Sequence, residues 1–435
     1  MIFAFDFPRE ENGIFYRPYE HTKEYTYNGL INYKGDYPCY GPAPPSLTDI
    51  LEQHKVEFEI VKSSDICSTD KSFYYLLETQ GPPEGWLGTY KNYTNTILSG
   101  VSEQIIEAAQ KRQCKIILFS SNEGYDPFQY KIFDKINQDI EKYGIPHEQF
   151  IFISGNLIID TLYDVWKKTE SRSYGIKCIP FNNELFDEYE DMQPNVKYDK
   201  ECNNRDKKFL LLNRQPRIHR IALISLLHSK GLLKDTLTSF PSEDLSPAPF
   251  SKKVHISQYF GRMLNFDDQT KSDCLMAWKD LEENHFPLIV DVEEWDTNHY
   301  GTSVDWLYDK TFLSIVVESI YDDLSVFLDE KIWKPIYNYH PFIMVGCPNS
   351  LKKLKELGFK TFHPFIDESY DSEHNHGKRL LMISDEIKKI HSKSNLELKK
   401  WYTQLTPILE HNKNKLLPWS KDKKNIIRNF IREIQ

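Results

Sequence analysis

Residues 312–365 read FLSIVVESIYDDLSVFLDEKIWKPIYNYHPFIMVGCPNSLKKLKELGFKTFHPF. This stretch begins with an apolar strand that ends at Glu318, and after a loop the residues Asp329–Lys331 begin a helix. A second apolar strand follows at Phe342–Val345. Open α/β sheets bind nucleotides and other anionic ligands where the carboxyl end of a strand meets the amino end of a helix. The stretch therefore predicts an α/β domain with a ligand site near Glu318.

The same alternation of strands and helices extends along the rest of the chain. KKFLLLN at Lys207–Asn213 predicts a strand, a helix from Pro216 closes at Gly231, and a further strand is expected at Pro287–Val292. In the first part of the chain we expect strands at Ile2–Phe7, Phe73–Leu77, Lys115–Ser120 and Phe150–Ile153, and helices at Val101–Arg112, Pro127–Tyr143 and Leu157–Lys168. Such alternation is typical of parallel sheets covered on both faces, so the predicted fold class is α/β.

Two α/β domains facing each other across a cleft are expected from this order of elements. The predicted parts are a first domain at residues 1–195, a second domain at 205–400 and a helical tail at 401–435. The acidic, strand-poor stretch Asn182–Asn204 suits a linker, and the stretch Asn12–Ser46, rich in Tyr, Gly and Pro, suits a long surface loop. Pro407 and Pro418 are expected to interrupt the helical tail.

The composition predicts a globular protein without a membrane span. The 435 residues are 40% hydrophobic and 14% aromatic, which suffices for sizeable cores. No apolar run reaches the roughly 18 residues that a membrane helix needs. The seven cysteines are scattered singly with no CxxC pair, which is typical of reduced thiols in a cytosolic protein. The formal net charge of -10 disfavours a nucleic-acid partner.

Arginines gather where the strand at Lys207–Asn213 passes into its helix. Arg214 follows Asn213 directly, and Arg217 and Arg220 come next at steps of three residues, which leaves them near one helix face. Cations at the positive end of a helix dipole are unfavourable by roughly 0.3–1 kcal/mol each, so an anion would explain the cluster. A diphosphate fits because guanidinium groups bind phosphate oxygens in pairs, and pairing with nearby carboxylates of the linker is the alternative.

Charged side chains also gather at the second junction of a strand with a helix. Glu318 and Glu330 can accept hydrogen bonds from paired sugar hydroxyls, and Lys331 adds a positive charge for phosphate. The structural alternative is that Asp329 caps the helix and Glu330 merely favours the helix dipole. The acidic pair Asp322–Asp323 lies in a polar loop, where acids are usually only solvated, so no metal site is predicted.

These residues resemble the motifs of the alpha-1,3-fucosyltransferases. That family has two Rossmann-like domains in the GT-B arrangement, and it places an arginine after a strand–Asn turn, then a strand ending in Phe-Glu-Asn-Ser, then Thr-Glu-Lys at a helix start. Here Arg220 follows Asn213, Val317–Ser319 ends the strand and Asp329–Lys331 begins the helix, in the same order. The runs HPFIMVG and LGFKTFHPF also look like a pattern in glycosyltransferase-like proteins of large viruses and phages. The resemblance covers roughly residues 207–380.

The resemblance implies a glycosyltransferase with a nucleotide-diphosphate sugar as donor. Arg220 and Lys331 would hold the diphosphate, Glu330 the ribose, and Glu318 the sugar or its hydroxyls. Ser319 replaces the family's asparagine, so a nucleotide sugar is expected and GDP-fucose is one candidate. Together with the arginine cluster, the predicted donor-binding residues are Asn213, Arg214, Arg217, Arg220, Glu318, Glu330 and Lys331.

The implied reaction is an inverting, metal-independent transfer to a glycan or another hydroxyl acceptor. Negative charge develops on the departing diphosphate, and arginine and lysine can stabilise that charge without a metal or other cofactor. Glu318 is one expected catalytic residue. The expected general base is Glu123, just after the strand at Lys115–Ser120 in the first domain. Its neighbour Asp126 is the alternative base, and an ordinary solvated acid is the structural interpretation of Glu123.

Two other functions are compatible with the sequence. An acceptor that is a modified base in DNA is one, supported by a small basic patch at Lys111, Arg112 and Lys115 but disfavoured by the net charge. A non-catalytic module that binds a nucleotide sugar is the other. The expected location is the cytoplasm, or the host cytoplasm if the protein is viral.

Overall fold

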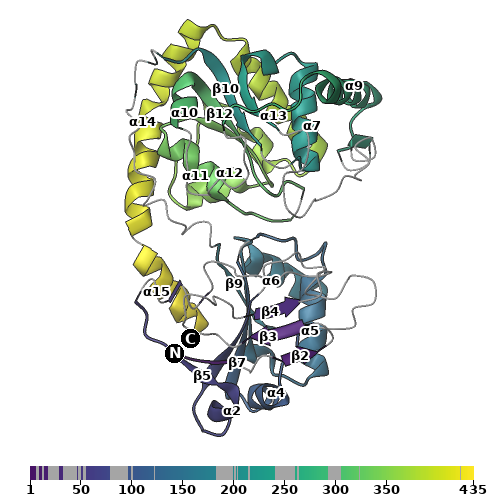
Figure 1. The fold of residues 1–435 in the computed structure, drawn as a ribbon, viewed down its shortest axis with the longest axis vertical. Helices are drawn as coiled ribbons and strands as arrows, with labels where there is room; N and C mark the ends of the chain where they lie inside the picture. Colours follow the sequence, from purple (N-terminus) through teal and green to yellow (C-terminus); the bar gives the residue numbers. More distant parts are fainter. Residues whose placement is uncertain are drawn as a thin grey trace. The chain divides into compact units, whose positions relative to one another are not determined.

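The computed structural model comprises two compact units, each built on a parallel sheet (Figure 1). Unit 1 consists of Met1–Glu184, Asp323–Phe327 and Asp422–Gln435, and unit 2 consists of Leu185–Asp322 and Leu328–Lys421. The structure describes residues 1–5, 9–11, 14–17, 29–32, 47, 50–51, 55–78, 97–98, 101–121, 123–182, 199, 202, 204–213, 216–240, 260–261, 264–291, 305–322, 324–421 and 423–435. The predicted α/β class is therefore confirmed, and the two parallel sheets are compatible with two α/β domains.

Unit 1 contains a six-stranded sheet in the order β5-β1-β6-β7-β8-β9, with every neighbouring pair parallel. Its strands are β1 (Ile2–Phe5), β5 (Glu59–Lys62), β6 (Phe73–Glu78), β7 (Cys114–Ser120), β8 (Phe150–Ser154) and β9 (Lys177–Pro180). In β7, Ile116 and Leu118 enter one core, while Ile117 and Phe119 are buried on the other face. Since side chains alternate between the faces of a strand, both faces of this sheet are covered, as parallel sheets require.

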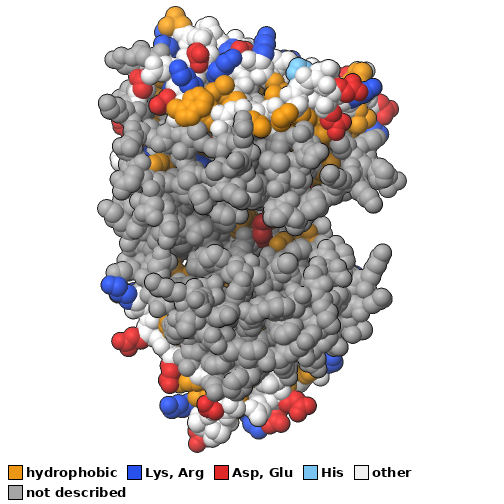
Figure 2. All heavy atoms as spheres, viewed as in Figure 1, with side chains coloured by type: hydrophobic (Ala, Val, Ile, Leu, Met, Phe, Trp, Pro, Cys, Tyr) orange, Lys and Arg blue, Asp and Glu red, His pale blue; other side chains and the backbone are white. Residues whose placement is uncertain are grey.

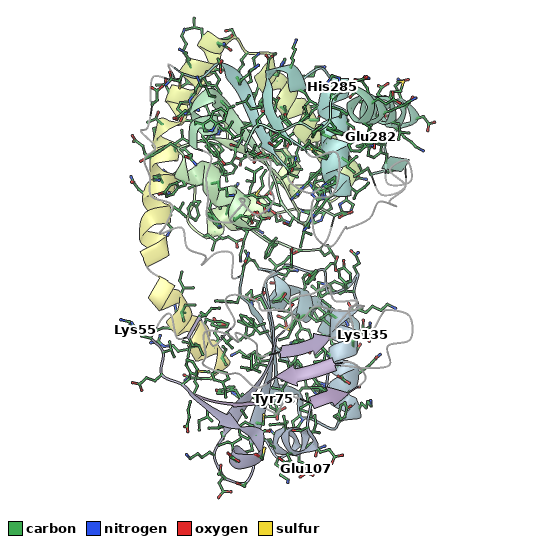
Figure 3. All side chains as sticks on the ribbon, in the orientation of Figure 1. Lys55, Tyr75, Glu107, Lys135, Glu282 and His285 are labelled. Carbon is green, nitrogen blue, oxygen red and sulfur yellow. The ribbon has the colours of Figure 1, made fainter. Side chains whose placement is uncertain are left out.

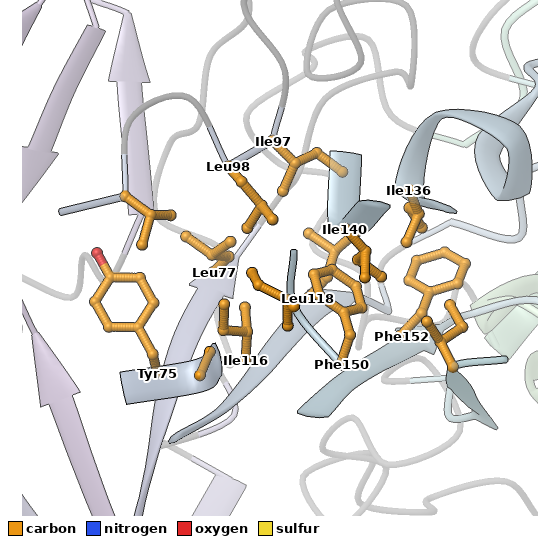
Figure 4. Close-up of a cluster of buried hydrophobic side chains, with 14 of the residues drawn as sticks. Tyr75, Leu77, Ile97, Leu98, Ile116, Leu118, Ile136, Ile140, Phe150 and Phe152 are labelled. Atoms are coloured by element: carbon orange, nitrogen blue, oxygen red, sulfur yellow. The ribbon is translucent and has the colours of Figure 1, made fainter. Parts of the chain in front are cut away.

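The helices of unit 1 supply that cover. They are α2 (Ser63–Ile66), α4 (Glu103–Gln110), α5 (Ile132–Lys142), α6 (Ile159–Thr169) and α15 (Lys423–Ile434), with a 3-10 turn at His147–Gln149. On one face, Ile136 and Ile140 of α5 pack over Phe150 and Phe152 of β8 (Figure 4). Near the last strand, Phe430 of α15 stacks on Phe181 with ring centroids 4.1 Å apart. The final helix of the chain is therefore part of unit 1.

A small antiparallel sheet lies where a surface loop was predicted. Its strands are β2 (Arg9–Glu11), β3 (Ile14–Arg17) and β4 (Gly29–Asn32). The loop prediction for Asn12–Ser46 is therefore wrong at β3 and β4. The sequence gives little strand signal here because Tyr, Gly and Pro interrupt any alternation, and pairing between neighbouring segments outweighs that weak local preference.

Unit 2 contains a four-stranded parallel sheet in the order β11-β10-β12-β13. The strands are β10 (Lys207–Leu212), β11 (Thr236–Ser239), β12 (Thr311–Val317) and β13 (Phe342–Val345). The helices are α7 (Ile218–Ser229), α9 (Asp268–Asn284), α10 (Asp305–Lys310), α11 (Glu330–Tyr337), α12 (Ser350–Glu356), α13 (His376–His391) and α14 (Asn395–Lys421), with 3-10 turns at Leu233–Asp235 and Ser369–Ser372. All seven residues of β12 are buried, as expected for a central strand.

Three predictions within unit 2 need correction. No strand forms at the described part of Pro287–Val292, where Leu288 makes only an isolated bridge with Phe240. The helix that was expected from Pro216 begins at Ile218, with Arg217 at its cap position. Helix α14 runs from Asn395 to Lys421 through both prolines that were expected to interrupt it. Proline disfavours a helix interior by about 3 kcal/mol, so packing of the long helix against unit 2 outweighs that cost.

The surface of the described residues carries mixed charge. On the face drawn in Figure 2, basic and acidic side chains are interspersed, and no patch of one sign stands out among the side chains that are described. The six cysteines within the described ranges are all free thiols. A search of the described helices found none that combines the length and apolarity needed to cross a bilayer.

Candidate functional site

The candidate site lies in unit 2, at the carboxyl ends of β10 and β12. These strands are neighbours, while β11 and β13 flank them on opposite sides, so the strand order reverses between β10 and β12. Open α/β sheets bind ligands at the carboxyl edge beside such a reversal. The register pairs Leu210 with Ser314, which brings Asn213 and Glu318 to the same edge of the sheet. The fold therefore puts two polar side chains at the expected ligand position.

Asn213, directly after β10, is a buried amide. Asn213 is only 1% exposed, and its backbone N–H donates a hydrogen bond to the carbonyl oxygen of Ser239 at 2.8 Å. Neither Oδ1 nor Nδ2 has a hydrogen-bond partner among the described residues. A buried polar group without a partner costs about 1–3 kcal/mol, so this amide favours a polar ligand.

Glu318, directly after β12, is a buried carboxyl group at 1% exposure. Its Oε2 accepts the backbone N–H of Asp329 at 3.3 Å, while Oε1 has no partner within the described part of the chain. Burial, with the adjacent Asp329 carboxylate, raises the pKa of Glu318 well above its ordinary value. The protonated form is therefore favoured, and it can donate a hydrogen bond as well as accept one. A side chain at Gly346 would crowd Glu318, since an added Cβ would lie 3.2 Å from Glu318 Cγ.

Asp329 is the N-cap residue of α11, and its carboxylate accepts several hydrogen bonds. Its Oδ1 accepts the backbone N–H of Lys331 at 2.9 Å, and its Oδ2 accepts the backbone N–H of Ser319 at 3.2 Å and its hydroxyl at 2.9 Å. Burial favours the neutral form, but the charge of Lys331 and hydrogen bonds from Glu318 and Lys331 outweigh burial and lower the pKa of Asp329. The two neighbouring acids therefore have pKa values shifted in opposite directions, down for Asp329 and up for Glu318.

Lys331 carries the positive charge at the start of α11. Its Nζ lies 2.7 Å from Asp329 Oδ2 and 2.8 Å from Glu330 Oε1. Burial lowers the pKa of Lys331, but the two carboxylates outweigh burial, so the pKa lies above its ordinary value. The Lys331 side chain is 24% exposed, and the two carboxylates hold its ammonium group in place. It is a fixed cation at the amino end of a helix.

Arg217 and Arg220, from the start of α7, point to the end of β12. Arg220 Nη2 lies 3.4 Å from the carbonyl oxygens of Val317 and Glu318, and Arg217 Nη1 donates to the carbonyl oxygen of Ser319. Burial and the charge of Arg217 lower the pKa of Arg220 to about 10. Arg220 is buried and Arg217 half-buried, so two guanidinium groups add positive charge at the end of β12, beside the acids Glu318, Asp329 and Glu330.

His219, Tyr321 and Arg379 support this end of β12 and were not predicted as site residues. His219 Nε2 lies 3.1 Å from the carbonyl oxygen of Glu318, and its ring stacks on Tyr321 with centroids 5.5 Å apart. Burial and the neighbouring arginines lower the pKa of His219 well below its ordinary value, so the neutral ring donates through Nε2. Arg379 is 1% exposed, and its guanidinium carbon lies 4.3 Å from the centre of the Tyr321 ring. Arg379 also donates a hydrogen bond to the carbonyl oxygen of Tyr321. The only sequence signal was the place of His219 between two arginines.

The predicted site residues are distributed as follows. Around the end of β12 the structure brings together Arg217, Arg220, Glu318, Glu330 and Lys331, with Asn213 at the neighbouring strand end. Arg214 lies outside the described residues. The acidic pair Asp322–Asp323 is only partly described, and no metal-type group involving Asp322 occurs among the described side chains.

Glu123 and Asp126 belong to unit 1, after β7. Glu123 is half-buried. Asp126 is buried, and its Oδ1 accepts the backbone N–H groups of Phe128 at 2.8 Å and Gln129 at 3.1 Å. Its Oδ2 accepts the N–H of Leu324 at 2.8 Å. Asp126 is thus occupied as a turn-forming residue, which makes it a poor alternative to Glu123 as a base.

The arrangement in unit 2 combines cations with groups that can exchange hydrogen bonds. Arg217, Arg220 and Lys331 suit an anion, and the amide of Asn213 with the protonated Glu318 suits hydroxyl groups. Comparison of the chain with protein-family models, curated proteins and solved structures found no match.

Proposed function

We propose that the chain is a glycosyltransferase that takes a sugar from a nucleotide-diphosphate donor and passes it to a glycan or another hydroxyl acceptor. The observation that supports this proposal most is the carboxyl edge at the strand reversal of unit 2. There the amide of Asn213 and Oε1 of Glu318, which have no hydrogen-bond partner among the described residues, lie at the same strand edge as the cations of two helix starts. A ligand with both a diphosphate and hydroxyl groups would satisfy both kinds of group.

In the proposed reaction, the cations stabilise the departing diphosphate. Arg217, Arg220 and Lys331 are held in place before the donor arrives, so little reorganisation is needed as the negative charge develops. Arg220 is the best-placed cation, because it is buried and the first turn of α7 adds its own N–H groups to the same field. No metal is required in this proposal.

Glu318 is proposed to hold the sugar. Its raised pKa is due to burial and partly to a hydrogen bond with the Asp329 carboxylate, so we propose that Glu318 accepts hydrogen bonds from the sugar hydroxyls. Glu330, only 9% exposed at the start of α11, is proposed for the ribose hydroxyls. Inversion then needs a base for the acceptor hydroxyl, and Glu123 of unit 1 is our proposal for that base in a GT-B arrangement of the two units.

A thermal-shift panel tests the donor site. We expect UDP, GDP, dTDP or CMP, or their sugars, to raise the melting temperature, since a ligand at about 100 times its Kd adds roughly 2.7 kcal/mol. Lys331→Ala should abolish the shift. Lys353→Ala is the matched control, because Lys353 has the same 24% side-chain exposure and also pairs with an acid, Glu356, at 3.4 Å.

The outcomes separate the candidate functions. A shift that persists in both Lys331→Ala and Arg220→Ala would place the nucleotide elsewhere and overturn the proposal. A shift that is lost in these variants, with release of nucleoside diphosphate when acceptors are supplied, supports it. Tight binding without turnover over a broad panel of donors and acceptors would leave a binding module in place of an enzyme.

A further inference from the structure

A second cluster of chemically active side chains lies at the far end of α7 from the donor site. His228 is in the last turn of α7, and Asp280 and His285 lie at the end of α9, which packs against α7 (Figures 1 and 3). One ligand atom from each residue lies within 4.8 Å of the others. Among the side chains that are described, this is the one group of three or more that could hold a metal ion.

Both imidazoles approach the same carboxylate oxygen. Asp280 Oδ2 lies 2.7 Å from Nε2 of His228 and 3.3 Å from Nε2 of His285. The other oxygen, Oδ1, accepts the side-chain N–H of Asn284 at 2.8 Å, one turn further along α9. That bond fixes the plane of the carboxylate, as the outer hydrogen bonds of metal-ligating acids do.

A hydrogen bond accounts for only part of this geometry. It explains the approach of His228, but His285 Nε2 lies 3.3 Å from the same oxygen without forming a hydrogen bond. The two rings meet edge to face, with centroids 5.1 Å apart. Two imidazole nitrogens and one carboxylate oxygen within 4.8 Å of one another are a set of atoms typical of transition-metal ligands.

We propose that His228, Asp280 and His285 bind a divalent transition metal of the zinc class. Metal–ligand bonds of about 2.0–2.2 Å in a tetrahedron hold ligand atoms roughly 3.4 Å apart, so the three atoms need only small shifts. The side chains of Asp280 and His285 are each 46% exposed, which gives the ion an entry path and leaves the fourth position to water. His228, at 23%, forms the inner side.

This metal site is separate from the proposed donor site. His228 follows Arg220 by eight residues, about 12 Å along the helix axis. The ion would join the last turn of α7 to the end of α9 and would not contact the donor. It would brace the helix whose first turn carries Arg217 and Arg220.

Calorimetric titration with Zn²⁺ tests the proposal on the full chain after treatment with a chelator. We expect about one equivalent to bind with micromolar or tighter affinity, and His285→Ala to weaken binding at least tenfold. The matched control is His391→Ala. His391 also contacts a carboxylate, Asp235, with Nε2 and Oδ2 2.9 Å apart, but that pair belongs to no group of three ligands within the described ranges.

Two further measurements keep the test decisive. Melting curves without metal establish that each variant folds, and Asp280→Asn provides a second ligand variant that keeps the side-chain shape. Crystals soaked in zinc should show anomalous density between the three side chains. Absence of zinc binding in the wild-type chain, or affinity that is unchanged in both His285→Ala and Asp280→Asn, would overturn the assignment.

Discussion

The carboxyl edges of the two parallel sheets differ in how their buried asparagines are used. Asn156 follows β8 in unit 1, and Asn213 follows β10 in unit 2, and both residues are at most 1% exposed. Both ends of the Asn156 amide are occupied: Oδ1 accepts the N–H groups of Ile158 and Val326 at 3.2 Å, and Nδ2 donates to the carbonyls of Tyr125 and Leu324. The amide of Asn213 has no such partners among the described residues.

The difference separates a structural polar residue from a candidate ligand contact. In unit 1 the segment Asp323–Phe327 occupies the edge, and its described backbone groups bond to Asp126, Asn156 and Leu157. In unit 2 no described segment satisfies Asn213. A buried asparagine near the carboxyl end of a strand thus has hydrogen-bonded side-chain atoms in unit 1 and, among the described residues, unbonded ones in unit 2.

The largest expected effect is on the occupied edge. Asn156→Ala should destabilise unit 1 by about 2–4 kcal/mol, because several buried backbone groups lose their partner at a cost of roughly 1–3 kcal/mol each. Calorimetric unfolding measures the loss, and faster hydrogen exchange at the Val326 amide locates it. Unchanged stability would mean that the contacts of Asn156 are not what holds the segment.

The unoccupied edge should respond in the opposite way. Asn213→Ala should change stability by less than about 1 kcal/mol, since it removes no described hydrogen bond of the side chain. It should weaken binding of the nucleotide donor roughly tenfold, or about 1.4 kcal/mol. Titration calorimetry measures the affinity. A large loss of stability with unchanged affinity would make Asn213 a structural residue and remove the contrast with Asn156.

The buried acids at the same edge predict opposite pH dependences. The folded-state pKa of Glu318 is raised, so its contribution to stability is present below its unfolded pKa and is lost as the pH rises through the folded value. Glu318→Gln should therefore raise the melting temperature at pH 8 relative to wild type, by an amount equivalent to about 1 kcal/mol or more, and give little difference at pH 4. Thermal melts from pH 4 to 9 measure this.

Asp329→Asn is the control for that experiment, with the opposite sign. The pKa of Asp329 is lowered, so its contribution is present above its unfolded pKa and is lost as the pH falls through the folded value. This variant should be less stable than wild type at pH 8, and the deficit should shrink on acidification. Curves of the same sign for both variants would contradict the assignment of a neutral Glu318 beside an ionised Asp329.

The smallest effect is expected at an exposed ion pair. Glu107 and Lys111 of α4 lie 3.2 Å apart, with side chains 63% and 69% exposed. Glu107→Gln should change stability by at most about 0.5 kcal/mol, because solvent screens such pairs. Calorimetric unfolding measures this change in stability, against which the effects of Asn156→Ala and Asn213→Ala can be compared. A change as large as that of Asn156→Ala would show that stability in unit 1 does not depend on burial of polar groups.

Local sequence patterns predicted two strands and a helix start of unit 2. The apolar runs at Phe312–Val317 and Phe342–Val345 form β12 and β13, and the Asp329 cap begins α11 as expected. The failures included the strand expected at Pro287–Val292, the surface loop expected where β3 and β4 form, and the breaks expected at two prolines of α14. In those places, packing with residues distant in the sequence outweighed local preference. Such packing cannot be inferred from one segment alone.

The sequence by itself determined that polar side chains follow buried strands and that arginines precede a buried helix. Those features are local, because a strand's length and a cap's chemistry depend on neighbouring residues. Only the tertiary structure decided that the Asn156 amide is hydrogen-bonded while the Asn213 amide has no partner among the described residues. It also decided that Glu318 lies against Asp329 and that His285 meets His228. Hydrogen bonding, burial and pKa depend on groups brought together from distant segments, so they exist only once the chain has folded.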